Sequence, residues 1–100
     1  MNIQQKNDQT TVVTGLQELV AANAAQVRDD IRAALPPTCL NLELDLSGLS
    51  FLDSSGLGAL ISLHKTLRLR DGIMRLIKPA ANVQQILELT RLHRVFEIVR

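Results

Sequence analysis

Two serine hydroxyls in a short polar segment are the groups in this sequence best placed to do chemistry. Ser54 and Ser55 lie in the run Asp53-Ser54-Ser55-Gly56, with apolar residues on both sides. A strand-like alternating run precedes this segment and the longest apolar helical run follows it, so the pattern predicts a strand-to-helix corner. Backbone N–H groups at the start of a helix are free and favour an oxygen atom or an anion. We therefore expect Ser54 to be the functional residue, which the rest of the fold presents to other molecules.

A catalytic role for Ser54 would require a base, and His64 and His93 are the two histidines that could serve. Hydrolases with a serine at a strand-to-helix elbow use the pattern G-x-S-x-G, and Leu52 here occupies the place of the first glycine. His64 also falls on an apolar helical stripe, where a histidine is more often packed than catalytic. We therefore predict that the chain is not an enzyme.

The sequence offers little to hold a cofactor or a metal ion. Gly56-Leu57-Gly58 matches a fragment of the dinucleotide-binding fingerprint, but Ile61 stands where its third glycine is required. One cysteine and two scattered histidines provide no metal-ligand spacing. We predict that no cofactor and no metal is bound.

Composition indicates one domain over residues 1–100. Hydrophobic residues make up 46% of the chain, with five Gly and three Pro. Eleven basic residues nearly balance ten acidic ones, and Trp and Tyr are absent, so neither charge nor stacking favours nucleic acid. The single cysteine suits a reducing compartment, the first residues form no signal-peptide core, and no apolar run approaches the ~18 residues of a membrane span. We expect a cytoplasmic protein without direct membrane insertion.

The hydrophobic pattern predicts an α/β fold in the order β-β-α-β-α-β-α-β. Strands are expected over residues 3–6, 10–14, 39–46, 73–77 and 95–99, and helices over residues 21–35, 57–70 and 80–89. The first two strands favour a hairpin, and the later helices favour crossovers between strands. A loop is expected over residues 47–52, just before the serine corner.

Individual residues indicate where the elements end and which faces are buried. Asn23 is the expected cap of the first helix, and Pro36-Pro37 is expected to end it. Alternate leucines should share one face of the central strand: Leu40, Leu42, Leu44 and Leu46. An apolar stripe should run along the second helix through Leu57, Leu60, Ile61, His64 and Leu67.

The stretch from Leu44 through Asp53-Ser54-Ser55-Gly56-Leu57-Gly58 resembles the STAS domain, specifically the bacterial anti-sigma factor antagonists. A later run, residues 83–96, matches the last helix and strand of that family, and the resemblance covers about residues 10–99. It implies a single STAS-like domain with a mixed sheet of four to five strands and helices packed mainly on one face. Two positions depart from the family pattern. Gln17-Glu18-Leu19-Val20 lacks the Gly and the Asp of a usual Gly-Glu-Leu-Asp turn, and Arg91 replaces a usual glycine.

The resemblance implies a partner-switching function. In that family the unphosphorylated antagonist binds an anti-sigma factor, which is also a serine kinase with a histidine-kinase-like (GHKL) domain, and a sigma factor is released. The kinase phosphorylates the first serine after the aspartate, here Ser54, which ends the binding. A metal-dependent serine phosphatase of the PP2C type removes the phosphate. The residues implied in partner binding are Asp53, Ser54, Ser55, Gly56, Leu57 and Gly58.

Several interpretations of the corner remain open from the sequence. Ser54 could be a plain helix cap with no other duty, and Ser55 is the competing hydroxyl for phosphorylation. Asp53 could orient the serine in the kinase or be a second cap. The whole chain could also be a STAS interaction module that is never phosphorylated, such as a cytoplasmic subunit of a lipid or solute ABC transporter.

Overall fold

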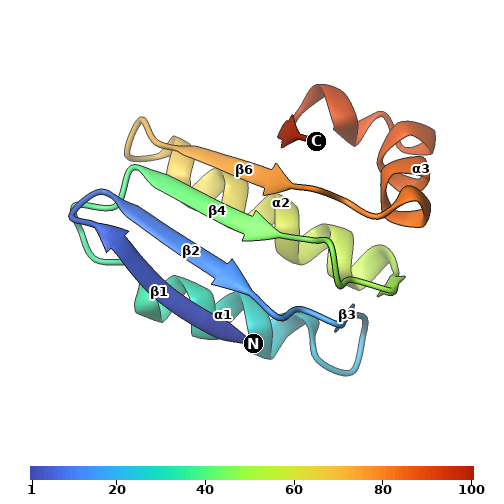
Figure 1. The fold of residues 1–100 in the computed structure, drawn as a ribbon, viewed down its shortest axis with the longest axis horizontal. Helices are drawn as coiled ribbons and strands as arrows, with labels where there is room; N and C mark the ends of the chain where they lie inside the picture. Colours follow the sequence, from blue (N-terminus) through green and yellow to red (C-terminus); the bar gives the residue numbers. More distant parts are fainter.

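A five-stranded mixed sheet forms the centre of the structure, a computed structural model that describes residues 1–100 (Figure 1). Its strand order is β1-β2-β4-β6-β7. The strands are β1 (Asn2–Asn7), β2 (Thr10–Thr14), β4 (Asn41–Asp45), β6 (Ile73–Ile77) and β7 (Glu97–Val99). The hairpin between β1 and β2 is antiparallel, and all other neighbours in this sheet are parallel. The predicted α/β fold with an antiparallel start is confirmed.

Two helices, α1 (Ala24–Ala34) and α2 (Ser54–Arg68), lie side by side behind the sheet in Figure 1. Arg32 of α1 joins them, since its guanidinium donates to the hydroxyl oxygens of Ser62 and Thr66 on α2. The third helix, α3 (Ala81–Leu89), lies beyond the end of β6, so the main helical layer covers one face of the sheet (Figure 1). This arrangement agrees with the predicted packing of helices mainly on one face.

The core is built from alternate residues of the strands and one stripe of each helix. Leu42, Leu44 and Leu46 are fully buried as predicted, whereas Leu40 precedes β4 and is only partly buried. The buried stripe of α2 is rotated from the expected one: Leu60 and Leu67 are in it, but Leu57, Ile61 and His64 are half-buried. The residues that replace them in the core are Gly56, Ala59 and Leu63.

The first helix begins at Ala24, three residues later than expected, because Asn23 stabilises the turn before it. The Asn23 Oδ1 atom accepts from the Val20 N–H at 2.9 Å, and its Nδ2 donates to the Glu18 carbonyl at 2.9 Å. Asn23 occupies the N-cap position but makes no side-chain bond to the helix. Asn23 is therefore the N-cap residue as predicted, but its side chain bonds to the preceding turn and not to the helix; Pro36-Pro37 follows the helix end as expected.

A second, two-stranded sheet was not predicted from the sequence. It pairs β3 (Glu18–Leu19) in parallel with β5 (Phe51–Leu52). The strand β5 lies inside residues 47–52, the segment expected to be a loop. The closing strand β7 is also shorter than predicted, since Leu92–Arg94 form a short 3-10 helix before it. The strand β5 of this small sheet leads directly into the serine corner.

Candidate functional site

Asp53, and not a serine, caps the helix at the strand-to-helix corner. Its backbone is extended (φ −117°, ψ −171°), and α2 begins at the next residue, Ser54. The Asp53 Oδ1 atom accepts a hydrogen bond from the Gly56 N–H at 3.0 Å. An aspartate in this position satisfies one of the free N–H groups of the first turn. The interpretation of Ser54 as a plain helix cap is therefore wrong.

The second carboxylate oxygen of Asp53 connects the corner to the loop after β3. Its Oδ2 atom accepts from the Ala21 N–H at 2.9 Å. Hydrogen bonds from the Gly56 and Ala21 N–H groups hold the pKa of Asp53 below its ordinary value of 3.8, because they stabilise the charged form. One ionised side chain thus fixes the start of α2 and the approach to α1 together.

The two serine side chains are free. Ser54 and Ser55 are both exposed, in the first turn of α2. Neither hydroxyl takes part in any of the side-chain hydrogen bonds of the structure, including those made by the neighbouring Asp53. The corner therefore presents two unbonded hydroxyls beside a helix N-terminus that favours negative charge.

The two glycines of the corner differ in their surroundings. Gly56 is buried, and a Cβ atom there would lie 2.0 Å from the Leu19 carbonyl oxygen and 2.7 Å from the Leu52 Cδ1 atom. Gly58 is exposed, and a Cβ atom there would meet nothing within 4 Å. Gly56 thus allows α2 to pack on β3, and among the two glycines only Gly58 leaves open surface that a partner can approach.

Phe51 is an exposed aromatic residue beside this corner that the sequence analysis did not single out. It lies in β5, with 65% of its surface exposed, while its neighbour Leu52 is half-buried. Phe51 borders a shallow cavity of about 440 Å³ with Gln17 and Glu18 of the β3 segment. The sequence places Phe51 two residues before Asp53, which could have indicated that it lies beside the corner. It was not singled out because residues 47–52 were expected to be a loop.

The segment that departs from the family pattern, residues 17–20, is held by backbone hydrogen bonds to the β5 region. The Gln17 carbonyl accepts from the Ser50 N–H at 2.9 Å, and the Leu19 carbonyl accepts from the Asp53 N–H at 3.3 Å. Gln17 does not have a positive φ, so the missing glycine is not needed for the backbone. At the other departure, Arg91 does adopt the left-handed conformation (φ 61°, ψ 14°) in which a glycine is usual.

His64 lies too far along α2 to act as a base for Ser54. His64 is ten residues further along α2, which places it about 15 Å away at the helical rise per residue. The His93 ring nitrogen lies 3.4 Å from the Leu87 carbonyl. No three residues among His, Cys, Asp and Glu come together in an arrangement that could hold a metal ion. No helix of the chain has both the length and the apolar character needed to span a membrane.

Comparison with known proteins places this fold among related domains. Residues 2–100 match the STAS domain family. A Thermotoga maritima protein, TM1081, whose structure is described as that of a candidate anti-sigma factor antagonist, is 23% identical with a TM-score of 0.85, covering 99% of this chain and 85% of its own. An anti-sigma factor antagonist from Mycobacterium paratuberculosis is 23% identical with a TM-score of 0.82, covering 98% of this chain and 82% of its own.

The Bacillus cell fate determinant SpoIIAA, also an anti-sigma factor antagonist, is similar in two states. Its unphosphorylated form is 22% identical with a TM-score of 0.83, covering 99% of this chain and 87% of its own. Its phosphorylated form is 21% identical with a TM-score of 0.75, covering 99% of this chain and 90% of its own. At these identities the likeness concerns the fold.

Proposed function

The chain belongs to the STAS domain family, and we propose that within this family it acts as an anti-sigma factor antagonist in a partner-switching pathway. The observation that carries the proposal is the division of roles at the corner: Asp53 caps α2, which leaves the Ser54 hydroxyl exposed and unbonded. A serine that served only as a cap would have its oxygen occupied by a backbone N–H group. Ser54 is instead available to a kinase.

In the proposed reaction Ser54 is the acceptor of a phosphoryl group. Its Oγ atom attacks the γ-phosphorus of ATP held by the kinase, the bond to the β-phosphate oxygen breaks, ADP leaves, and the hydroxyl proton passes to a base of the kinase. This protein is the substrate and not the enzyme. It binds no cofactor in this reaction.

Phosphorylation is expected to change the surface more than the fold. A phosphate adds about −1.5 to −2 charges and three acceptor oxygens, and the free N–H groups and dipole at the start of α2 favour both. The new charge lies beside Asp53, which is ionised at neutral pH and whose pKa the hydrogen bonds from Gly56 and Ala21 lower further. A partner that presents acidic groups or a nucleotide to this corner is then repelled.

The proposed contact surface combines the free hydroxyls with the open backbone and apolar groups around them. Ser54, Ser55 and Gly58 are exposed, Leu57 is half-buried, and Phe51 adds an exposed aromatic ring. Aromatic side chains are common anchors of protein–protein contacts. Asp53 and the buried Gly56 support this surface indirectly, because they fix where α2 begins.

The proposed partners are an anti-sigma factor with a histidine-kinase-like (GHKL) serine kinase domain and a PP2C-type phosphatase. The unphosphorylated protein sequesters the kinase, phosphorylation at Ser54 ends binding, and the phosphatase restores it. The two solved forms of SpoIIAA, unphosphorylated and phosphorylated, support the proposal by likeness of fold. The proposed location is the cytoplasm, where the kinase and ATP are present.

The test is to mix the protein with ATP and the cognate kinase and to measure intact mass. We expect a gain of one phosphate that is lost in Ser54→Ala and kept in Ser55→Ala. Ser55→Ala is the matched control, since both serines are exposed in the same turn. A kinase that binds the protein without modifying it would point to the interaction module that is never phosphorylated, and loss of the phosphate in Ser55→Ala alone would move the site by one residue.

A further inference from the structure

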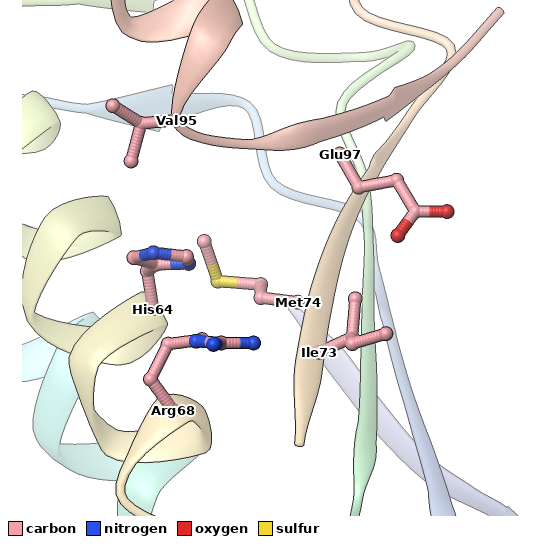
Figure 2. Close-up of a pocket in the computed structure, with 6 residues that line it drawn as sticks. All are labelled: His64, Arg68, Ile73, Met74, Val95 and Glu97. Atoms are coloured by element: carbon pink, nitrogen blue, oxygen red, sulfur yellow. The ribbon is translucent and has the colours of Figure 1, made fainter. Parts of the chain in front are cut away.

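A second cluster of chemically capable side chains lies at the other end of α2 from Ser54 (Figure 2). It surrounds a pocket of about 300 Å³ between α2, β6 and the start of β7. The lining residues are His64, Arg68, Ile73, Met74, Val95 and Glu97. None of them belongs to the serine corner.

The pocket exists because β7 is shorter than β6. The register between them begins at Arg75 opposite Glu97, so Ile73 and Met74 have no strand beside them on that edge. The last turns of α2 form one wall, and Val95, with 47% of its surface exposed, lies across the opening from them (Figure 2). Met74 is 1% exposed and forms an apolar floor. The sheet edge is thus left open above a hydrophobic surface.

The charge in the pocket is positive and not neutralised. Arg68 takes part in no ion pair and no side-chain hydrogen bond, and its guanidinium points away from α2 towards Ile73 (Figure 2). Glu97 is the acidic residue of the lining, but its Oε1 atom accepts from the Arg75 Nε at 3.2 Å. In Figure 2 the Glu97 carboxylate also points away from His64 and Arg68. A negatively charged ligand would therefore find an unpaired guanidinium.

His64 brings an unsatisfied polar atom to the same place. Its ring packs edge-on against Phe96, with 5.5 Å between ring centroids and an interplanar angle of 85°. Its Nδ1 atom is buried and has no hydrogen-bond partner. Buried polar atoms without partners are uncommon and cost stability, so each one calls for an explanation. A neutral imidazole can donate from Nδ1, and a rotation of the ring that exposes this atom would let it bond to a ligand in the pocket.

We propose that this pocket binds a small amphipathic carboxylate. The planar guanidinium of Arg68 offers a carboxylate two parallel donors, and His64 can supply another. The hydrocarbon body lies on Met74, Ile73 and Val95, where a thioether adapts readily to different shapes. The volume lies at the lower end of that of small-molecule sites, which suits a ligand of roughly ten heavy atoms. The site is independent of Ser54 and of the function proposed above.

The test is a titration of the isotope-labelled protein with hexanoate, followed by ¹H–¹⁵N NMR. We expect saturable shifts at Arg68, Met74 and Glu97, with a dissociation constant on the order of 1 mM or lower for a ligand of this size. Hexan-1-ol, which has the same chain without the charge, should bind at least about tenfold more weakly because it cannot pair with Arg68. Inorganic phosphate, which has charge without an apolar body, should not saturate the site.

Two matched variants separate the pocket from general effects. Arg68→Gln should weaken hexanoate binding by about tenfold or more, whereas Lys65→Gln, the same charge change at an exposed position of the same helix outside the pocket lining, should leave it within about twofold. Both residues are exposed, so both variants should fold. The proposal is overturned if hexanoate shifts no lining residue at 10 mM concentrations, if hexan-1-ol or phosphate binds equally well, or if the two variants behave alike.

Discussion

At the scale of single residues, capping the helix and presenting a free hydroxyl are divided between Asp53 and Ser54. Asp53 holds the start of α2 through the Gly56 N–H and the loop before α1 through the Ala21 N–H. The Ser54 hydroxyl therefore makes no hydrogen bond within the fold. A modification of Ser54 then removes no interaction that the folded state depends on, whereas a change at Asp53 removes two.

Asp53→Asn should lower stability by an amount that depends on pH. An asparagine oxygen still accepts from Gly56, but the amide group that replaces Oδ2 cannot accept from the Ala21 N–H. The pKa of Asp53 is lowered in the folded state, so its contribution is present above the unfolded value near 3.8 and is lost as the pH falls through the folded value. Thermal midpoints of both proteins between pH 7 and pH 2 would show the difference.

The expected result is a wild-type midpoint that exceeds that of Asp53→Asn at neutral pH and converges with it in acid. Both proteins should lose stability in acid, because Asp29 and Asp45 also have lowered pKa values, and the difference between the two curves isolates Asp53. Asp53→Ala is the reference for loss of both bonds and should have the lowest midpoint at pH 7. A gap that stays constant from pH 7 to pH 2 would contradict the ionised-carboxylate account.

Arg91→Gly should stabilise the protein. Arg91 adopts φ 61° directly after α3 and its C-cap residue, a conformation in which the Cβ atom of an L-residue is strained and glycine is not. We expect the free energy of unfolding to rise by about 0.5–1 kcal/mol, measured by urea denaturation. Arg91→Ala is the control, since it removes the side chain but keeps the Cβ atom. An equal gain from alanine would mean that the arginine side chain, and not its backbone conformation, carries the cost.

At the scale of elements, the first turn of α2 packs closely on β3. The sequence could not show this contact. Local patterns predicted β2 over residues 10–14 and β6 over residues 73–77 with the observed bounds, because each has five residues of clear strand character. The strands β3 and β5 have two residues each, too few for a period of two to be visible. They form because the tertiary fold brings these two distant segments of the chain side by side, and no local pattern encodes that contact.

The same limit explains which site residues were identified. Ser54 was predicted as the candidate because a family pattern and a strand-to-helix corner coincide at it, and the structure confirms the corner. The sequence left the cap open between Asp53 and Ser54, since both are common N-cap types and only the observed helix start decides between them. The position of Phe51 and the burial of Gly56 both depend on the β3–β5 pairing, which the sequence did not show. The rotated stripe of α2 depends on tertiary packing, which buries Leu63.

Gly56→Ala and Gly58→Ala should change stability in opposite directions. The alanine methyl at position 56 would overlap the Leu19 carbonyl at 2.0 Å, a backbone atom that can move only with β3, so the free energy of unfolding should fall by about 1–3 kcal/mol or more. At position 58 the methyl meets nothing within 4 Å, and alanine in a helix is favoured over glycine by about 0.5–1 kcal/mol. Chemical denaturation of both variants measures this contrast.

Gly58→Ala also tests the proposed contact surface, since the variant should be more stable and yet bind the kinase less well. A methyl group on this open part of α2 would keep a partner's loop from approaching the backbone closely. Binding measured by calorimetry should therefore weaken while the thermal midpoint rises. Unchanged affinity would remove Gly58 from the contact surface without affecting the assignment of Ser54.

At the scale of the whole molecule, the two proposed sites lie towards opposite ends of one helix, α2, which packs on the core. The core of buried leucines runs between the sheet and α1 and α2, and α2 spans the distance from the serine corner to the pocket at His64. Modification at Ser54 touches neither the core nor the sheet. The partner switch proposed above would therefore require no second folded state, only a change of charge on one surface.

Ser54→Asp should therefore separate stability from binding. An acidic residue at the first position of α2 interacts favourably with the helix N-terminus, so the thermal midpoint should stay within a few degrees of wild type. Affinity for the kinase should fall at least about tenfold, because the added charge lies beside the ionised Asp53 in the contact surface. Ser54→Asn, nearly the same in shape but neutral, is the matched control and should bind more tightly than the aspartate variant. Calorimetric titration of both variants at low and high salt measures the effect, which should shrink as salt screens the charges. If the aspartate variant bound as well as wild type, or lost binding only because it unfolded, repulsion at the corner could not be the basis of the switch.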